Sequence, residues 1–285
     1  MAERAIDYLV NHFTPESIRK NYLAGEERER FESVGRAAGL QGYTPREFVA
    51  RLRALGIEKI LVPAILTWSW REQRPIEQTT VEEVVEVARE APEVIFGLYG
   101  VNPRRGMEGV AGLERAVREH GFRGMHIHPH GFGFPPNHQY YFPYYAKCHE
   151  LGVAAVISMG HTLDFMPIEP GRPIYLDDVA LYFPGLKIVC AHTGWPWVEE
   201  AIALASKHPH VYLGTSAYAP KYWRPELVRF IDSRRGRDKV LWGTDWPLVK
   251  HDEALEQIAA LGLREESKRK LLYDNAARVF GFGSG

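Results

Sequence analysis

The sequence predicts an α/β fold, a (β/α)8 or TIM barrel, from three observations. The chain has 285 residues, which suits a barrel of roughly 250 residues built around one large core. Short runs rich in Val, Ile and Leu alternate with longer segments of helical period, as in a parallel sheet covered by helices. These runs number eight, one for each strand of a barrel. We therefore expect one barrel domain over residues 1–285.

The predicted strands are spread along the whole chain. They are Arg4–Val10, Lys59–Ala64, Val94–Val101, Arg123–Pro129, Ala154–Met159, Lys187–His192, Val211–Thr215 and Val240–Thr244. Amphipathic segments between them are predicted to be helices, among them Thr44–Leu55, Thr79–Ala91, Met107–His120, Tyr140–Leu151 and Pro196–Lys207. The first of these helices begins with a threonine that can cap it and a proline that suits its first position.

An open, doubly wound sheet uses the same alternation of strands and helices. Neither its dinucleotide fingerprint, G-x-G-x-x-G after a predicted strand, nor a P-loop occurs in the sequence, so we favour the closed barrel. Two segments depart from the tight repeat, residues 12–43 and 131–137, and each follows the carboxyl end of a predicted strand. Loops at these ends build the active sites of barrels.

Composition and charge narrow the choice of partners. The formal net charge is -1 and acidic and basic residues are interspersed, which removes the electrostatic basis for nucleic-acid binding. The sequence shows no signal-peptide layout and no apolar run near the ~18 residues of a membrane span. We therefore predict a cytoplasmic protein that binds a small-molecule substrate, with neither nucleic acid nor membrane as a partner. The sequence is also compatible with a homo-oligomer.

Polar and ionisable side chains stand at or just beyond the ends of the predicted strands. Because the carboxyl ends of barrel strands converge on one mouth, these residues are candidates for a functional site. The assigned residues are Asn11, Trp68, His126, His128, His130, Ser158 and Tyr218 for substrate binding, and His161, His192 and Asp245 for catalysis.

His192 and Asp245 form the strongest pair. Each follows an apolar strand directly, in Lys187-Ile-Val-Cys-Ala-His192 and Val240-Leu-Trp-Gly-Thr-Asp245. An imidazole and a carboxylate that face one cavity can activate water as acid and base, or bind a metal together. The structural alternative is an aspartate that caps the next helix and a histidine bonded to backbone. The pattern occurs at two separate strand ends, which favours a function.

The run from His126 through His128 to His130 alternates, so in a strand the three imidazoles lie on one face, as chelating ligands do. Alternation alone is a weak signal, because three such histidines also suit a wet barrel mouth or an anionic substrate. Trp68 belongs to a group of aromatic residues near predicted loops that suits a flat ligand. Ordinary burial explains each of these aromatic residues equally well.

The sequence resembles the amidohydrolase-related family over nearly the whole chain. The resemblance rests on the segments around His192 and Asp245, namely Phe183-Pro-Gly-Leu-Lys-Ile-Val-Cys-Ala-His192-Thr-Gly and Val240-Leu-Trp-Gly-Thr-Asp245-Trp-Pro, and on the closing Leu271-Leu-Tyr-Asp-Asn275-Ala-Ala-Arg-Val-Phe280. It implies a (β/α)8 barrel, in agreement with the strand count. It also implies an activity like that of the family's hydrolases and nonoxidative decarboxylases of aromatic or enol-type acids.

The departures from the family pattern concern the metal ligands. Members usually begin with Asp-x-His-x-His, whose histidines help to bind a divalent metal, whereas this chain has Leu9 and Asn11 there. The histidine usual on strand five aligns with Ser158, so only His192 and Asp245 remain of the usual set. A tightly held metal generally needs three or more protein ligands. We therefore predict no metal at the usual site and no cofactor. The alternative is Zn, Mn or Fe at a relocated site built from His192, Asp245, His161 and His128.

These residues are consistent with several functions. We favour a hydrolase that cleaves an ester-like or carbon–carbon bond in a small aromatic or β-dicarbonyl substrate, with Asp245 and His192 as acid and base and His161 or Tyr218 orienting the carbonyl. Part of residues 131–161 also resembles proteins described as β-ketoacyl-CoA hydrolases. The runner-up is a nonoxidative decarboxylase, favoured if a substrate carboxylate meets Arg123 or the histidine run. The same residues are also consistent with a metalloenzyme that has relocated ligands and with a catalytically inert, ligand-binding barrel.

Overall fold

The computed structural model describes residues 3–33, 35, 37 and 39–283. Its main sheet contains eight parallel strands in the order β1-β2-β5-β6-β7-β8-β9-β10. These are β1 (Ala5–Asp7), β2 (Ile57–Pro63), β5 (Ile95–Gly100), β6 (Gly124–Ile127), β7 (Ala154–Ser158), β8 (Ile188–Ala191), β9 (Val211–Gly214) and β10 (Val240–Leu241). A parallel bridge between Val10 and Trp246 joins the segments that follow the two outer strands. The predicted TIM-barrel fold is confirmed.

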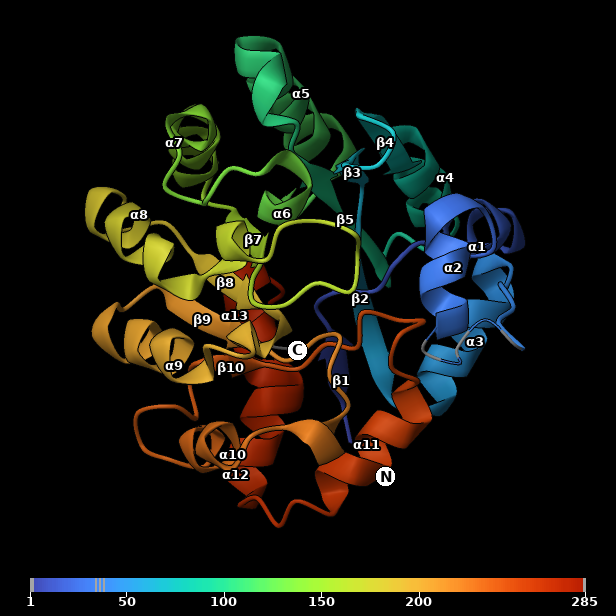
Figure 1. The fold of residues 1–285 in the computed structure, drawn as a ribbon. Helices are drawn as coiled ribbons and strands as arrows, with labels where there is room; N and C mark the ends of the chain where they lie inside the picture. The colour runs from blue at the N-terminus through green and yellow to red at the C-terminus, as the bar shows by residue number, and fades with distance from the viewer. Residues whose placement is uncertain (1–2, 34, 36, 38, 284–285) are drawn as a thin grey trace.

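Helices surround the strands as an outer ring (Figure 1). They are α3 (Pro45–Ala54), α4 (Val81–Glu90), α5 (Gly106–His120), α7 (Phe142–Leu151), α8 (Leu176–Tyr182), α9 (Val198–Lys207), α10 (Pro225–Ile231), α11 (His251–Ala259) and α12 (Glu265–Arg269). The five helices predicted from the sequence correspond to α3, α4, α5, α7 and α9. The expected start of α3 is also found, because the Thr44 side chain accepts a hydrogen bond from the Glu47 backbone N–H and Pro45 follows it.

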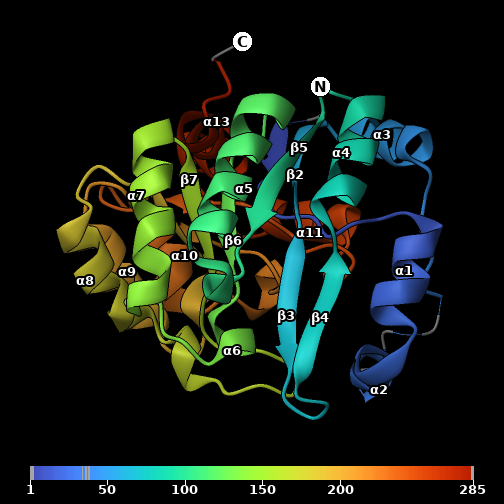
Figure 2. The ribbon, with the colours of Figure 1, turned by 90° about the horizontal axis from the view of Figure 1, so that it is seen from above.

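Two buried apolar layers hold the barrel together. The inner layer contains one or two side chains from nearly every strand, such as Ile6, Leu61, Val156 and Leu241, and the outer layer fills the space between the strands and the helices. Residues of α13 (Asn275–Phe280), which follows a π-helical turn at Lys270–Asp274, belong to the inner layer. Figure 2 shows that α13 and both termini lie at one end of the molecule. That end is therefore closed by apolar packing.

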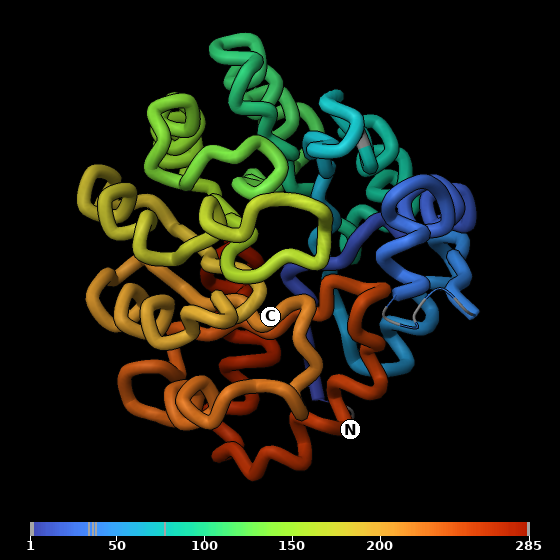
Figure 3. Tube along the Cα trace, viewed as in Figure 1, coloured from blue at the N-terminus to red at the C-terminus, as the bar shows by residue number. Residues whose placement is uncertain are grey.

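Segments inserted at the opposite end were not predicted as regular structure. Residues 12–43 contain α1 (Pro15–Tyr22) and α2 (Gly25–Ser33), and an antiparallel hairpin of β3 (Ile65–Ser69) and β4 (Arg74–Thr79) follows β2. The tip of this hairpin, α2 and the short α6 (Pro129–Phe132) lie at the same end of the molecule (Figure 2). The loop after β7 crosses the middle of the view along the barrel (Figure 3). These segments cover the mouth at which the strands end.

The prediction of a strand that extends through Pro129 was wrong. Strand β6 ends at Ile127, His128 caps the next helix and His130 lies within that helix, α6. Proline has no backbone N–H for the sheet and its φ suits the first turn of a helix, so Pro129 ends the strand. The three histidines therefore do not lie on one strand face.

Candidate active site

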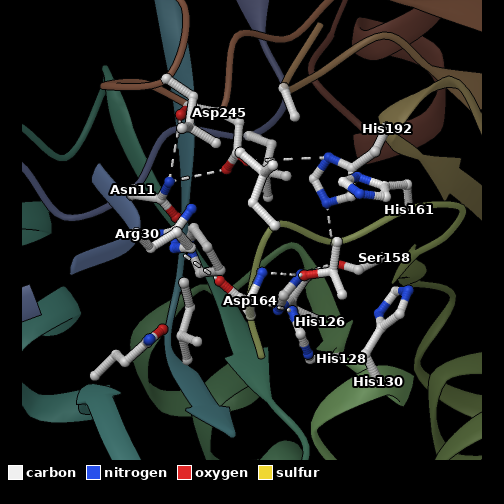
Figure 4. Close-up of a pocket in the computed structure, with 18 of the residues that line it drawn as sticks. Asn11, Arg30, His126, His128, His130, Ser158, His161, Asp164, His192 and Asp245 are labelled. Atoms are coloured by element: carbon white, nitrogen blue, oxygen red, sulfur yellow. Dashed lines mark hydrogen bonds and ion pairs between the residues drawn. The ribbon is translucent and has the colours of Figure 1, made fainter. Parts of the chain in front are cut away.

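A cavity of about 420 Å³ opens at the carboxyl ends of the strands. Nearly all the predicted site residues line it, namely Asn11, His126, His128, His130, Ser158, His161, His192, Tyr218 and Asp245. Trp68 does not belong to this lining, and its ring lies 5.7 Å from the Arg104 guanidinium. Figure 4 shows the polar side chains converging on the cavity from different strands and loops. The barrel topology therefore brings together groups that are as many as 234 residues apart in sequence.

Asp245 is held at the mouth by its neighbours on both sides. Its Oδ1 accepts a hydrogen bond of 2.8 Å from Asn11 Nδ2, and its Oδ2 lies 4.0 Å from Nδ1 of His192. Burial raises the pKa of Asp245, and this effect outweighs the opposing influence of His192, Asn11 and Arg30. The carboxylate is thus a better proton acceptor than an exposed aspartate, and it stands beside the imidazole as expected.

His192 lies in a chain of buried hydrogen bonds. Its Nε2 is 3.1 Å from Ser158 Oγ, and its Nδ1 is 3.0 Å from Ser216 Oγ. The Ser158 hydroxyl is also 3.0 Å from Nε2 of His126, and Ser216 is hydrogen-bonded to the Tyr8 hydroxyl. Both ring nitrogens of His192 are therefore engaged by serine hydroxyls.

The backbone at the two strongest candidates has an uncommon conformation. His192 has φ of 60° and Asp245 has φ of 55°, both in the left-handed region that few non-glycine residues adopt. Each residue immediately follows a strand or its extension, so the turn aims its side chain across the mouth. Conformations of this kind persist where the surrounding structure enforces them, and they cluster at functional sites.

The surroundings of His126, His130 and His161 favour the neutral form of their imidazoles. Burial, followed by the charges of His128 and His192, holds the pKa of His126 well below its usual range. Burial also lowers the pKa of His130 to about 3 and lowers that of His161. His130 donates from Nε2 to the Gly160 carbonyl at 2.8 Å. The lowered pKa values favour the neutral form of these imidazoles, which can donate or accept hydrogen bonds.

A charged cluster that the sequence did not reveal lines the other side of the cavity. Arg30 on α2 is 3.0 Å from Asp164 Oδ1 and is hydrogen-bonded to Glu27, while Nε2 of His128 is 3.6 Å from Asp164 Oδ2. Burial and then the charge of Asp164 raise the pKa of Glu27 to about 7. Burial disfavours ionised Asp164, but Arg30 and His128 outweigh it and lower its pKa. We call Glu27, Arg30, His128 and Asp164 the insertion cluster.

The donor set does not fit the metal centre that the family pattern implies. Leu9 supplies only carbon, Asn11 uses its amide to hold Asp245, and Ser158 bridges two imidazoles. Over residues 3–33, 35, 37 and 39–283, no group of three His, Cys, Asp or Glu side chains is arranged to hold a metal. Among the described residues, His128 and His161 are thus not gathered with His192 and Asp245 into such a group.

The protein is a TIM barrel, and its polar cavity lies at the strand ends, where the active sites of such barrels are found. Residues 12–282 match the family model described as amidohydrolase, and the chain belongs to this family. Among the described residues, no helix has the length and apolar character needed to cross a membrane.

Solved structures with the same fold cover nearly the full length of the chain. An uncharacterised TIM-barrel protein from Bordetella bronchiseptica is 22% identical with a TM-score of 0.76, and each chain is covered to 98%. A dihydroxybenzoic acid decarboxylase from Polaromonas, with bound manganese and 2-nitroresorcinol, is 17% identical with a TM-score of 0.69, and 100% of this chain and 98% of that chain are covered. A probable 2-pyrone-4,6-dicarboxylic acid hydrolase from Acinetobacter baumannii is 14% identical with a TM-score of 0.65, and 98% of this chain and 100% of that chain are covered.

Proposed function

We propose that the protein is a hydrolase of a small organic substrate with an ester-like or β-dicarbonyl group, and that it works without a tightly held metal. The observation that carries this proposal is the Asp245–His192 pair in a cavity where Leu9, Asn11 and Ser158 occupy the other usual ligand positions. His192 accepts a proton from water during attack on the carbonyl, and the nearby Asp245 carboxylate stabilises the imidazolium that forms.

The cavity also suits the class of substrate. Its volume of about 420 Å³ falls within the range typical of small-molecule sites. His161 and Tyr218 line it and offer groups that can orient a carbonyl, and burial raises the pKa of Tyr218 to about 12, so its hydroxyl keeps its proton. The decarboxylase and the hydrolase of similar fold are described as acting on ring-containing acids, which supports an aromatic or similarly flat substrate.

A nonoxidative decarboxylase is the second candidate, because Arg30 lines the cavity and a substrate carboxylate needs a positive partner. Arg30 already contacts Glu27 and Asp164, so its charge is compensated. Arg123, the other expected partner, lies 5.1 Å from the centre of the Phe96 ring and does not belong to the cavity lining. Burial lowers the pKa of His126, His128, His130 and His161, which favours their neutral forms. The electrostatics therefore favour a hydrolase of an uncharged group.

The first test measures metal content and activity on the same preparation. The protein is purified without added metal or a histidine tag, and its zinc, manganese and iron are measured by elemental mass spectrometry. Esters, β-dicarbonyl compounds and aromatic acids are then assayed with and without EDTA. We expect far less than one metal per chain, hydrolysis that survives EDTA, and no release of CO₂. Stoichiometric metal with activity lost in EDTA would contradict the metal-free proposal, and CO₂ release from an aromatic acid would favour the decarboxylase.

A further inference from the structure

We propose that Ser158 is a catalytic nucleophile that forms a covalent acyl-serine intermediate, with His192 as its general base. This inference rests on the proposed hydrolase function and replaces water by a serine hydroxyl in the first half of the reaction. The observation behind it is the position of the Ser158 hydroxyl, which lines the cavity and lies within hydrogen-bonding distance of two imidazoles. Figure 4 shows the hydroxyl between His126 and His192.

The arrangement has the three parts of an activated nucleophile. The Ser158 Oγ is 3.1 Å from Nε2 of His192, and the opposite nitrogen of that ring is 3.0 Å from Ser216 Oγ and 4.0 Å from Asp245 Oδ2. A nucleophile, a base within hydrogen-bonding reach and a group that orients the base define such sites on unrelated folds. Here Ser216 orients the ring and Asp245 supplies the negative charge.

Of the two imidazoles beside Ser158, His192 is the better base. A hydroxyl has one hydrogen, so Ser158 donates to one ring and accepts from the other. Positive charge on His192 is stabilised by the carboxylate of Asp245. Positive charge on His126 is opposed by burial and by His128 and His192, which hold its pKa low. His126 therefore donates from Nε2 to Ser158 and directs the hydroxyl hydrogen to His192.

The reaction is balanced with water as the only co-reactant. The Ser158 proton moves to Nε2 of His192 as Oγ bonds to the carbonyl carbon and the carbonyl electron pair moves to oxygen. The bond to the leaving oxygen then breaks, and that oxygen takes the proton from His192. In the second half, water gives a proton to His192 and adds to the acyl carbon. The acyl–Oγ bond breaks and the proton returns to Ser158. One ester bond and one water become an acid and an alcohol.

The test uses a small serine-directed probe, diisopropyl fluorophosphate, on the full-length protein. The probe phosphorylates an activated hydroxyl and releases fluoride, and it needs no knowledge of the substrate. We expect one adduct per chain by intact-protein mass spectrometry, located at Ser158 by peptide mapping, and none in Ser158→Ala. Ser206→Ala is the matched control, because this serine is exposed on α9. The Ser206→Ala protein should be labelled at Ser158 like the wild type. His192→Gln should slow labelling by at least ~100-fold, the lower range for a general base.

The outcomes separate this inference from the proposed function. No adduct at Ser158, or ester hydrolysis retained in Ser158→Ala within about threefold, would overturn the nucleophile while leaving a hydrolase that activates water directly. Labelling that is equally fast in His192→Gln would overturn the assignment of the base. An adduct at Ser158 in a protein that hydrolyses none of the tested acyl compounds would support the activated serine and count against the proposed substrate class.

Discussion

The two sides of the cavity are built differently, although both are buried and polar. On one side, Ser158, His192 and Asp245 stand at or just after the strands and are connected by hydrogen bonds to other strand-end residues. On the other side, the insertion cluster joins α2, the residue after β6 and the loop after β7 through the Arg30–Asp164 ion pair and the contact between His128 and Asp164. Strand ends are positioned by the whole barrel, whereas the inserted segments depend on their own contacts. We infer that chemistry belongs to the first side, and cohesion and substrate access to the second.

This division predicts that the largest effect on turnover comes from Asp245→Asn. The substitution keeps the shape of the side chain and removes the charge that stabilises protonated His192. Asparagine also tolerates the left-handed backbone at this position. We expect kcat to fall by about 10²- to 10⁴-fold, because the general base His192 loses the carboxylate that stabilises its protonated form. Steady-state kinetics measure this effect, and thermal unfolding should give a midpoint close to that of the wild type.

Asp252→Asn is the control for this charge removal, because Asp252 is exposed in the first turn of α11. It should leave both turnover and stability unchanged. Turnover by Asp245→Asn at the wild-type rate would remove Asp245 from the chemistry. A large drop in its unfolding temperature would instead make it a structural residue like those of the insertion cluster.

The second largest effect is expected from Arg30→Gln, and on stability rather than on turnover. The Arg30 side chain is only 10% exposed and contacts two carboxylates. Removing one partner of a buried ion pair typically costs about 3–5 kcal/mol, because the remaining charge is left uncompensated. We expect a loss of about 3 kcal/mol, since Glu27 can take up a proton, with kcat changed by less than tenfold. Urea unfolding measures the stability.

Arg28→Gln on the same helix is the matched comparison. Its pair with Glu32 is exposed on both sides, and such pairs contribute about 0–1 kcal/mol. The proposed division would fail if Arg30→Gln proved as stable as the wild type yet lost most of its turnover. Arg30 would then act on the substrate, which would strengthen the case for a decarboxylase.

The same contrast explains how much could be predicted from the sequence. The strands were recognisable because buried parallel strands form continuous apolar runs, and His192 and Asp245 were recognisable because they place an ionisable group directly after such runs. Barrel geometry then places these residues at one mouth, so their proximity followed from topology alone. Ser158 was identified as a substituted metal ligand and assigned to substrate binding, but its position between two imidazoles depends on side-chain geometry.

Arg30, Glu27 and Asp164 could not be identified in this way. The segment Gly25-Glu-Glu-Arg-Glu-Arg-Phe-Glu-Ser33 has so many charges that nothing marks Arg30 as the one that is buried, and Asp164 lies in a loop without periodicity. Their pairing depends on how α2 and the loop after β7 meet over the mouth. The signal that was available is the long departure from the strand–helix repeat at residues 12–43, which marks the segment as a candidate but not its residues.

The smallest of these effects concerns the pH dependence of stability through Glu27. Its pKa is raised from 4.5 to about 7 in the folded protein, so between these values the unfolded chain loses the proton while the folded protein keeps it. Stability contributed by this group is therefore complete at low pH and is lost as pH rises from about 4.5 to about 7. Glu27→Gln cannot titrate and can still accept a hydrogen bond from Arg30. As the pH rises over this window, we expect the free energy of unfolding of the variant to increase by about 1–3 kcal/mol relative to that of the wild type. Above the window the difference between the two proteins should stay constant.

Urea unfolding at several pH values between 4.5 and 8 measures this difference, and subtraction of the wild type removes the contributions of the titratable groups that the two proteins share. Glu29→Gln is the control, because the Glu29 side chain is 60% exposed and pairs with Arg71 at the surface. Its difference from the wild type should stay small, since an exposed ion pair contributes about 0–1 kcal/mol. A flat difference for Glu27→Gln as well would show that the insertion cluster is hydrated, and the contrast between the two sides of the cavity would then lie in position alone and not in burial.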